Sequence, residues 1–135
     1  MPTFSYSRTI HFPDTDAAGV IFFARYLSIA HEAYEEALAD VGIPLGQFFS
    51  DQGVILPIAK SEASYLRPLV CGDRVRIDVT PTRFSDNTFT VDYVLWKLSP
   101  TEKRAAVMRT EHVCLDSSSR ARLALPAELA AWVDA

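Results

Sequence analysis

The order of hydrophobic patterns along the chain is the feature that most restricts its fold: one strand, one amphipathic helix, then four strands. Residues 3–12 alternate apolar and polar positions, which is the period of a half-buried strand. From Leu27 to Val41 the apolar residues recur at spacings of three and four, and Gly42 with Pro44 marks the end of that helix. A single helix among antiparallel strands predicts an α+β fold, because a doubly wound sheet needs helices alternating with its strands.

The later strands lie where β-branched and aromatic residues concentrate. We expect them at residues 54–66, 73–83, 87–98 and 104–115. The clearest alternation runs from Phe89 to Leu95, and turn-forming residues between the segments predict hairpin connections. A short helix is expected at residues 128–133, behind Pro126. The pattern therefore predicts a five-stranded antiparallel sheet wrapped around one long helix.

Length and charge limit the class of protein. A chain of 135 residues fits a single domain spanning residues 1–135. The formal net charge of −4 argues against broad nucleic-acid binding, which needs a basic face. The first residues lack the apolar stretch of a secretion signal, and no apolar run approaches the roughly 20 residues of a membrane span. We expect a cytoplasmic protein with neither a nucleic-acid nor a membrane partner.

Two cysteines and one apolar segment give further expectations. Cys71 and Cys114 lie far apart without histidine or cysteine at metal-ligand spacing, so reduced thiols are expected and neither a metal nor a redox cofactor. Residues 54–59 are apolar on both strand parities, and one helix covers only part of a five-stranded sheet. Because monomers rarely expose large apolar patches, we expect a homo-oligomer.

The segment from Asp14 to Gly19 carries the most chemical information, because two acids and three small residues precede an apolar turn. An EF-hand loop would need an oxygen ligand at Ala18 and a glutamate at Arg25, and a phosphoryl-transfer Asp-x-Asp site would need a buried parallel strand. Asp14 is best interpreted as a turn or capping residue. Asp16 differs, since its small neighbours leave room for a ligand.

This segment resembles the active-site signature of the 4-hydroxybenzoyl-CoA thioesterase group of hotdog proteins: Asp-x-Asp-x-x-Gly, two aliphatic residues and an aromatic one. Residues 65–68 and 71–73 resemble the aromatic, proline and Gly-Asp pattern that opens the next strand of that group. Within the group, residues 31–35 and 112–114 look most like the 1,4-dihydroxy-2-naphthoyl-CoA hydrolases of phylloquinone (vitamin K1) synthesis. The resemblance implies a hotdog fold and hydrolysis of an aromatic acyl-CoA. It also implies a site between subunits of a dimer of dimers, a homotetramer.

The resemblance also assigns residues. Asp16 would be catalytic, either by attacking the thioester carbon or by orienting water, and the backbone N–H of Phe23 would stabilise the oxyanion. The remaining substrate-binding candidates are Gly19, Phe22, Tyr26 and His31. Phe22 and Tyr26 could equally be core residues, and His31 could be exposed or locally bonded.

Neighbouring acids and cations are assigned more simply. Glu32 and Glu35 are expected to be solvated, and the role of His112 stays open. The phosphates of CoA would need Arg or Lys, none of which the sequence singles out.

Two other functions stay open besides hydrolysis of a naphthoyl-CoA thioester. One is a thioesterase for another acyl group, such as 4-hydroxybenzoyl or a short chain, on CoA or an acyl carrier protein. The other is a non-catalytic CoA-binding hotdog protein.

Overall fold

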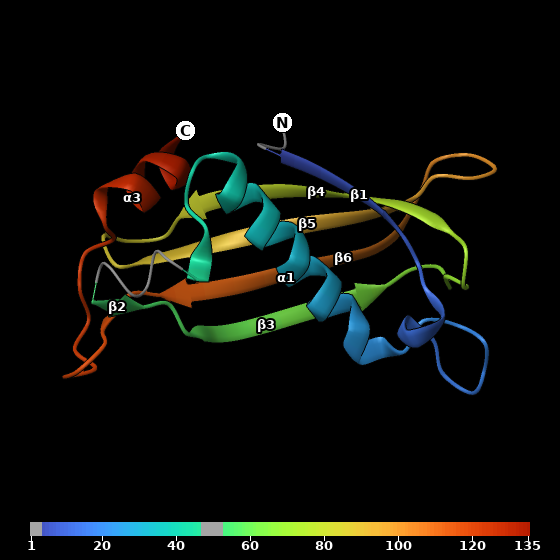
Figure 1. The fold of residues 1–135 in the computed structure, drawn as a ribbon, viewed down its shortest axis with the longest axis horizontal. Coiled ribbons are helices and arrows are strands. Elements are labelled where there is room, and N and C mark those ends of the chain that lie inside the picture. Colours follow the sequence, from blue (N-terminus) through green and yellow to red (C-terminus); the bar gives the residue numbers. More distant parts are fainter. Residues whose placement is uncertain (1–3, 47–52) are drawn as a thin grey trace.

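The main sheet holds five antiparallel strands. A computed structural model describes residues 4–46 and 53–135. The strands lie side by side in the order β1-β4-β5-β6-β3. Their bounds are Phe4–Thr9 (β1), Arg74–Arg83 (β4), Thr88–Lys97 (β5), Lys103–Val113 (β6) and Ile58–Tyr65 (β3). The predicted α+β class and five-stranded antiparallel sheet are confirmed (Figure 1).

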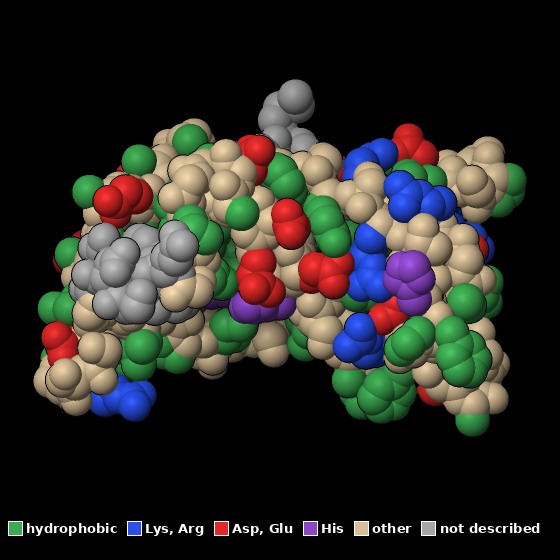
Figure 2. Space-filling view, in the orientation of Figure 1, with side chains coloured by type: hydrophobic (Ala, Val, Ile, Leu, Met, Phe, Trp, Pro, Cys, Tyr) green, Lys and Arg blue, Asp and Glu red, His purple; other side chains and the backbone are tan. Residues whose placement is uncertain are grey.

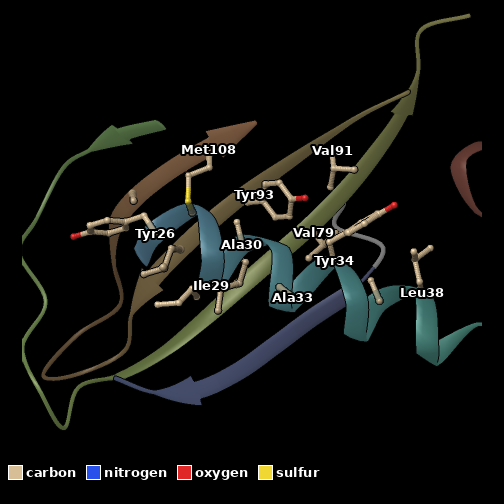
Figure 3. Close-up of a cluster of buried hydrophobic side chains, with 14 of the residues drawn as sticks. Tyr26, Ile29, Ala30, Ala33, Tyr34, Leu38, Val79, Val91, Tyr93 and Met108 are labelled. Carbon is tan, nitrogen blue, oxygen red and sulfur yellow. The ribbon is translucent and has the colours of Figure 1, made fainter. Parts of the chain in front are cut away.

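One long helix, α1 (Phe23–Asp40), crosses one face of this sheet (Figure 1). The buried side chains of α1 recur at helical spacing and are Tyr26, Ile29, Ala30, Ala33, Tyr34, Ala37 and Leu38. They pack against the face of the sheet that is turned toward the helix. On this face Phe89, Val91, Tyr93 and Leu95 of β5 are at most 1% exposed. Figure 3 shows these two surfaces packed together. The core therefore lies between α1 and the sheet, as both periodicities require.

Shorter elements complete the fold. Strands β2 (Val54–Ile55) and β7 (Leu115–Asp116) form a separate two-stranded sheet. The expected terminal helix is α3 (Ala127–Asp134), with Pro126 as its N-cap and three side chains in the core, namely Leu129, Trp132 and Val133. Cys71 is exposed, Cys114 is buried, and both are free. Within residues 4–46 and 53–135, no helix combines the length and hydropathy needed to cross a bilayer.

Three expectations need correction. The strand expected at residues 54–66 is wrong as one element, because β2 ends at Ile55 and Pro57, which has no N–H for a ladder, precedes the start of β3 at Ile58. Phe12 is 78% exposed rather than on a buried strand face, since β1 ends at Thr9 and a 3₁₀ turn (η1, Phe12–Asp14) follows. Val41 is 51% exposed because α1 ends one residue earlier.

Strand β3 is an open edge of the sheet. It pairs with β6 on one side only, and seven of its eight residues are exposed. An edge strand presents unpaired backbone N–H and C=O groups to any strand that can approach. The described chain therefore has a long pairing surface at β3, next to the beginning of α1 (Figure 1).

Candidate active site

The candidate site is built on the loop that leads from η1 into α1, residues 14–22, called here the signature loop. A bridge pairs Thr15 with Ile21, and the N–H of Asp16 donates to the carbonyl of Val20 at 2.9 Å. The N–H of Gly19 donates back to the carbonyl of Asp16 at 3.0 Å, with Gly19 at φ +83°. That conformation favours glycine, so the tight closure of the loop depends on this residue.

Asp16 presents its carboxylate at the protein surface. One oxygen accepts a hydrogen bond from the N–H of Ala18 at 2.8 Å. Among the described residues, no group donates to its second oxygen. The loop therefore fixes one side of the carboxylate and leaves the other available to a substrate or a water molecule.

Asp14, the first residue of the signature loop, is buried and only 1% exposed. Its two oxygens accept from Arg8 at 2.6 Å, from Arg25 at 2.6 and 3.1 Å, and from the N–H of His11 at 2.9 Å. Burial alone would raise the pKa of Asp14, but the His11 N–H and the two guanidinium groups lower it below its ordinary value. The structural interpretation of Asp14 is confirmed, and its role extends beyond a turn: it ties β1, the signature loop and α1 together.

The beginning of α1 offers unpaired backbone donors. Phe23 is the first helical residue, and its N-cap, Phe22, makes no side-chain capping bond. The first turn contains no acidic residue. Because the first N–H groups of a helix lack intrahelical partners and lie at the positive end of its dipole, they can stabilise a developing negative charge. The rings of Phe22 and Phe23 are 42% and 63% exposed and flank these donors.

The structure separates the other candidates. Tyr26 is buried, with its ring 4.8 Å from that of Tyr65. His31 follows Phe23 by about 12 Å along the helix axis. Its Nδ1 lies 3.1 Å from a carboxylate oxygen of Glu35, which matches a locally bonded histidine. Asp16, Gly19, Phe22 and Phe23 are thus gathered at one end of α1, whereas His31 lies outside this group.

Glu32 and the buried His112 differ from the other polar residues of the helix and sheet. The expectation that Glu32 is merely solvated is wrong, because it accepts a hydrogen bond from Tyr6 at 2.5 Å and pairs with Arg8. His112 is 1% exposed, stacks on Phe89, and shares a 2.7 Å hydrogen bond with Thr110. Burial first, and the charge of His31 second, lower the pKa of His112 to about 4.

Sequence reasoning missed the clamp that Arg8 and Arg25 form on Asp14. One signal was available: Arg8 follows Phe4 and Tyr6 on the same strand parity, and a charge on a buried face needs a buried partner. In Figure 2, blue basic side chains gather on the half of this face where α1 begins.

Comparisons with known proteins agree with this geometry. The family model described as the thioesterase-like superfamily matches residues 10–133. The chain belongs to the thioesterase-like superfamily. Within it, the chain is 48% identical to a 1,4-dihydroxy-2-naphthoyl-CoA hydrolase of Synechococcus elongatus, over 98% of this chain and 96% of that protein. It is 45% identical to a hydrolase of the same name from Thermosynechococcus vestitus, over 98% of this chain and 89% of that one.

The crystal structure of a relative supports the assignment to this superfamily. The crystal structure of a 1,4-dihydroxy-2-naphthoyl-CoA thioesterase from Synechocystis superposes with a TM-score of 0.92 at 30% identity, covering 97% of this chain and 95% of that one. The predicted hotdog fold is thereby confirmed for this superfamily member. The signature loop and four of the five strands of the main sheet lie within residues 10–133, which the family model matches, and β1 ends just before them.

Proposed function

We propose that this chain hydrolyses 1,4-dihydroxy-2-naphthoyl-CoA to the free acid and CoA, a step in phylloquinone biosynthesis. The observation that carries the proposal is the identity of 40 to 48% with hydrolases of that name across at least 95% of the chain. The exposed carboxylate of Asp16 and the uncapped start of α1 supply the groups that thioester hydrolysis needs. Water adds across the C–S bond, and CoA leaves as a thiol.

Asp16 is the proposed catalytic residue. Its open oxygen either attacks the thioester carbon to give an acyl anhydride, which water then hydrolyses, or holds a water for direct attack. Both routes place negative charge on the carbonyl oxygen. The N–H of Phe23 is the proposed donor to that oxyanion, and one such donor lowers the barrier by about 3 kcal/mol. Gly19, Phe22, Tyr26 and His31 remain candidates for substrate contacts.

A homo-oligomer is part of the proposal. Tyr65, the last residue of the open edge strand β3, lies with its ring against that of Tyr26 in α1. A second copy pairing along β3 would therefore bring its own residues to the signature loop. Pairing of identical edges is isologous and generates a two-fold dimer. Two such dimers would give the homotetramer that the family resemblance implies.

Replacing Asp16 with Asn tests the catalytic role. With 1,4-dihydroxy-2-naphthoyl-CoA as substrate, we expect Asp16→Asn to lower kcat about a hundredfold or more and to change KM little, because the charge is removed while the shape is kept. Asp40→Asn, an exposed aspartate at the other end of α1, is the matched control and should leave both constants unchanged. Full turnover by Asp16→Asn would refute the role of Asp16.

A substrate panel tests the acyl group. The wild-type chain should turn over the naphthoyl thioester far faster than 4-hydroxybenzoyl-CoA or acetyl-CoA. Comparable kcat/KM for the acetyl and naphthoyl thioesters would contradict the naphthoyl assignment in favour of a general acyl-CoA thioesterase. Binding of CoA without turnover of any of the three would instead support a non-catalytic CoA-binding protein.

A further inference from the structure

A row of polar side chains runs from the middle of α1 to the signature loop. Glu32 accepts a hydrogen bond from the hydroxyl of Tyr6 on one oxygen at 2.5 Å, and on its other oxygen from Arg8 at 3.3 Å. A second nitrogen of Arg8 donates to Asp14 at 2.6 Å. The side chains of Tyr6, Arg8 and Glu32 are called here the brace. The brace joins β1 to the third turn of α1 and ends on the carboxylate that holds the loop.

The brace fixes the guanidinium group of Arg8 on three sides. Its Nε donates to the carbonyl of Thr9 at 3.1 Å, while one terminal nitrogen donates to Glu32 and the other to Asp14. The side chain of Arg8 is only 11% exposed. Because a guanidinium group is planar and rigid, fixing one of its edges also sets the direction of the others. Glu32 therefore determines how Arg8 meets Asp14.

Tyr6 orients Glu32 for this contact. Burial first, and the hydrogen bond to Glu32 second, raise the pKa of Tyr6 to about 12, so its hydroxyl stays a donor at neutral pH. With one oxygen bound to Tyr6, Glu32 turns the other toward Arg8. The side chain of Glu32 is 41% exposed, yet both of its oxygens accept a hydrogen bond. The acid is thus held in one orientation although it lies at the surface.

Asp14 transmits this alignment to both halves of the proposed site. Its carboxylate binds Arg8, and its backbone carbonyl accepts from the N–H of Phe22 at 2.9 Å. Phe22 directly precedes Phe23, the proposed oxyanion donor. Asp16 follows Asp14 by two residues. A shift of Asp14 would therefore move the carboxylate of Asp16 and the start of α1 relative to each other.

Other ion pairs of the described residues end elsewhere. His31 and Glu35 pair one turn apart on α1, and Arg109 pairs with Asp92 on the neighbouring strand. Neither pair includes a residue of the signature loop. The brace differs from them because it leads to Asp14, a buried residue of that loop.

We propose that Glu32 is a positioning residue for the proposed hydrolysis, acting through Arg8 and Asp14. It holds the carboxylate of Asp16 and the N–H of Phe23 in the geometry that the reaction needs. The proposal rests on the proposed function and on the role of Asp16 in it. Glu32 follows Phe23 by about 14 Å along the helix axis, so it acts from outside the reacting centre. Because a misplacement of about 1 Å can lower a rate by about a hundredfold, Glu32 affects kcat rather than KM.

Glu32→Gln tests this role. The substitution removes the charge and nearly keeps the shape, so the contact with Arg8 weakens. We expect kcat for the naphthoyl-CoA thioester to fall about tenfold, with KM nearly unchanged. The midpoint of urea unfolding should stay close to that of the wild type, because a half-exposed ion pair adds little to stability. A wild-type kcat in Glu32→Gln, or a rise in KM at constant kcat, would overturn the proposal.

Glu36→Gln is the matched control. Glu36 lies one turn further along α1 and is exposed. Its substitution makes the same chemical change on the same helix and should leave kcat and KM unchanged. An equal loss of kcat in both variants would point to the overall charge of α1 and contradict a specific role of Glu32.

A double-mutant cycle tests the path through Arg8. Arg8→Gln removes the guanidinium group that joins Glu32 to Asp14, and it should lower kcat more than Glu32→Gln does. Adding Glu32→Gln to Arg8→Gln should then change kcat by less than about twofold, because the connection is already broken. Losses that multiply in the double variant would refute the path, since they would indicate two independent effects.

Hydrogen exchange separates failure of the brace from failure of the proposed function. The N–H groups of Asp16 and Gly19 are hydrogen-bonded within the signature loop, so their exchange with deuterium reports opening of the loop without any substrate. In Glu32→Gln both should exchange about fivefold faster than in the wild type, and in Glu36→Gln at the wild-type rate. This result would support the brace even if the naphthoyl thioester proved not to be the substrate. Unchanged exchange in Glu32→Gln would show that Glu32 does not hold the loop.

Discussion

Asp14 shows how a single buried residue can hold in place the loop that presents the proposed catalytic residue, Asp16. Its carboxylate is 1% exposed and accepts hydrogen bonds from the two arginines and one backbone N–H. A buried charge of this kind is stabilising only while its partners remain, because an unpaired buried charge is costly. The loop that presents Asp16 therefore depends on a neighbour two residues away that never meets solvent.

Replacing Asp14 with Asn should destabilise the fold. We expect Asp14→Asn to lower the free energy of unfolding by about 3 kcal/mol at pH 7, since it leaves two guanidinium groups facing a neutral amide. Urea unfolding followed by circular dichroism measures this. Asp16→Asn makes the same chemical change in the exposed loop and should alter the free energy by less than about 0.5 kcal/mol.

The same clamp predicts a pH dependence. Because the pKa of Asp14 is lowered in the folded state, its contribution to stability is present above the ordinary aspartate pKa of about 3.9. It is lost as the pH falls further, through the lowered folded value. The stability difference between wild type and Asp14→Asn should therefore be constant from pH 7 to about pH 5 and shrink below pH 4. A difference that persists unchanged at the lowest pH would contradict an ionised Asp14.

His112 should set the stability in a separate pH window. Its folded pKa of about 4 lies below the ordinary value of 6.5, so the unfolded chain binds a proton first as the pH falls. The stabilising contribution is complete above pH 6.5 and is lost as the pH falls toward 4, by about 3 kcal/mol.

The matched pair His112→Gln and His31→Gln isolates this effect. His112→Gln removes the titrating group and should flatten the dependence of unfolding free energy on pH between 6.5 and 4. His31→Gln should keep most of that slope, because burial lowers the pKa of His112 more than the charge of His31 does. Equal slopes in all three proteins would show that His112 does not titrate in this way.

At the level of elements, the start of α1 lacks a stabilising cap at the point where the proposed oxyanion donor lies. Phe22 makes no capping bond, although Ser, Thr, Asp or Asn at such a position stabilises a helix by about 1 kcal/mol. A capping side chain at position 22 would accept from the N–H of Ala24 or Arg25, directly beside the N–H of Phe23 that the proposed oxyanion needs, and would bring a competing acceptor to this helix end. The missing cap is therefore consistent with a helix end reserved for substrate.

Phe22→Ser tests this trade-off. The serine hydroxyl should accept from the N–H of Ala24 or Arg25 and raise the free energy of unfolding by about 0.5 to 1 kcal/mol, and its oxygen, placed beside the oxyanion position, should lower kcat. Phe22→Ala removes the ring without adding an acceptor and should lower kcat less. If the alanine variant loses as much activity as the serine variant, the ring rather than the free N–H groups is what matters.

The sequence predicted those elements in which the spacing of apolar residues matches the spacing of buried side chains. Phe89 to Leu95 alternate on β5 as expected, since that strand has neighbours on both sides and a helix over one face. The start of α1 was less apparent, because Phe23 is exposed and joins no apolar stripe. The break at Pro57 was hidden for a similar reason: an edge strand with both faces exposed has no burial pattern to read.

The candidate site was only partly predictable. The positions of Asp16, Gly19 and Phe23 follow from a local motif and a helix end, which short-range patterns describe well. The clamp on Asp14 requires β1 and α1 to converge, although Arg8 and Arg25 lie 17 residues apart in the sequence. Such contacts between distant segments depend on the register of the sheet, which one sequence alone does not give.

For the whole molecule, the exposed edge of β3 decides whether the site is complete in one chain. The strand is eight residues long and contains no proline, and its protections against edge pairing are the charged side chains of Lys60 and Glu62 and one irregularity between Ile58 and Lys60. Its last residue, Tyr65, lies with its ring 4.8 Å from that of Tyr26 in the first turn of α1. A copy pairing along β3 would cover this edge and close the side of the signature loop, in accord with the proposed oligomer.

Proline substitutions on β3 test that assembly. Successive backbone N–H groups of an antiparallel edge strand alternate between its neighbour, β6, and the open side. Of Ser61→Pro and Glu62→Pro, one therefore removes an N–H that faces outward. We expect the wild type to have a mass in solution of four times 15.0 kDa. The outward-facing variant should form smaller species with an unchanged circular dichroism spectrum, whereas the other should unfold more readily. Because the proposed site takes residues from two chains, the dissociated variant should also lose turnover. A wild type that sediments at 15.0 kDa with full activity would show instead that one chain suffices.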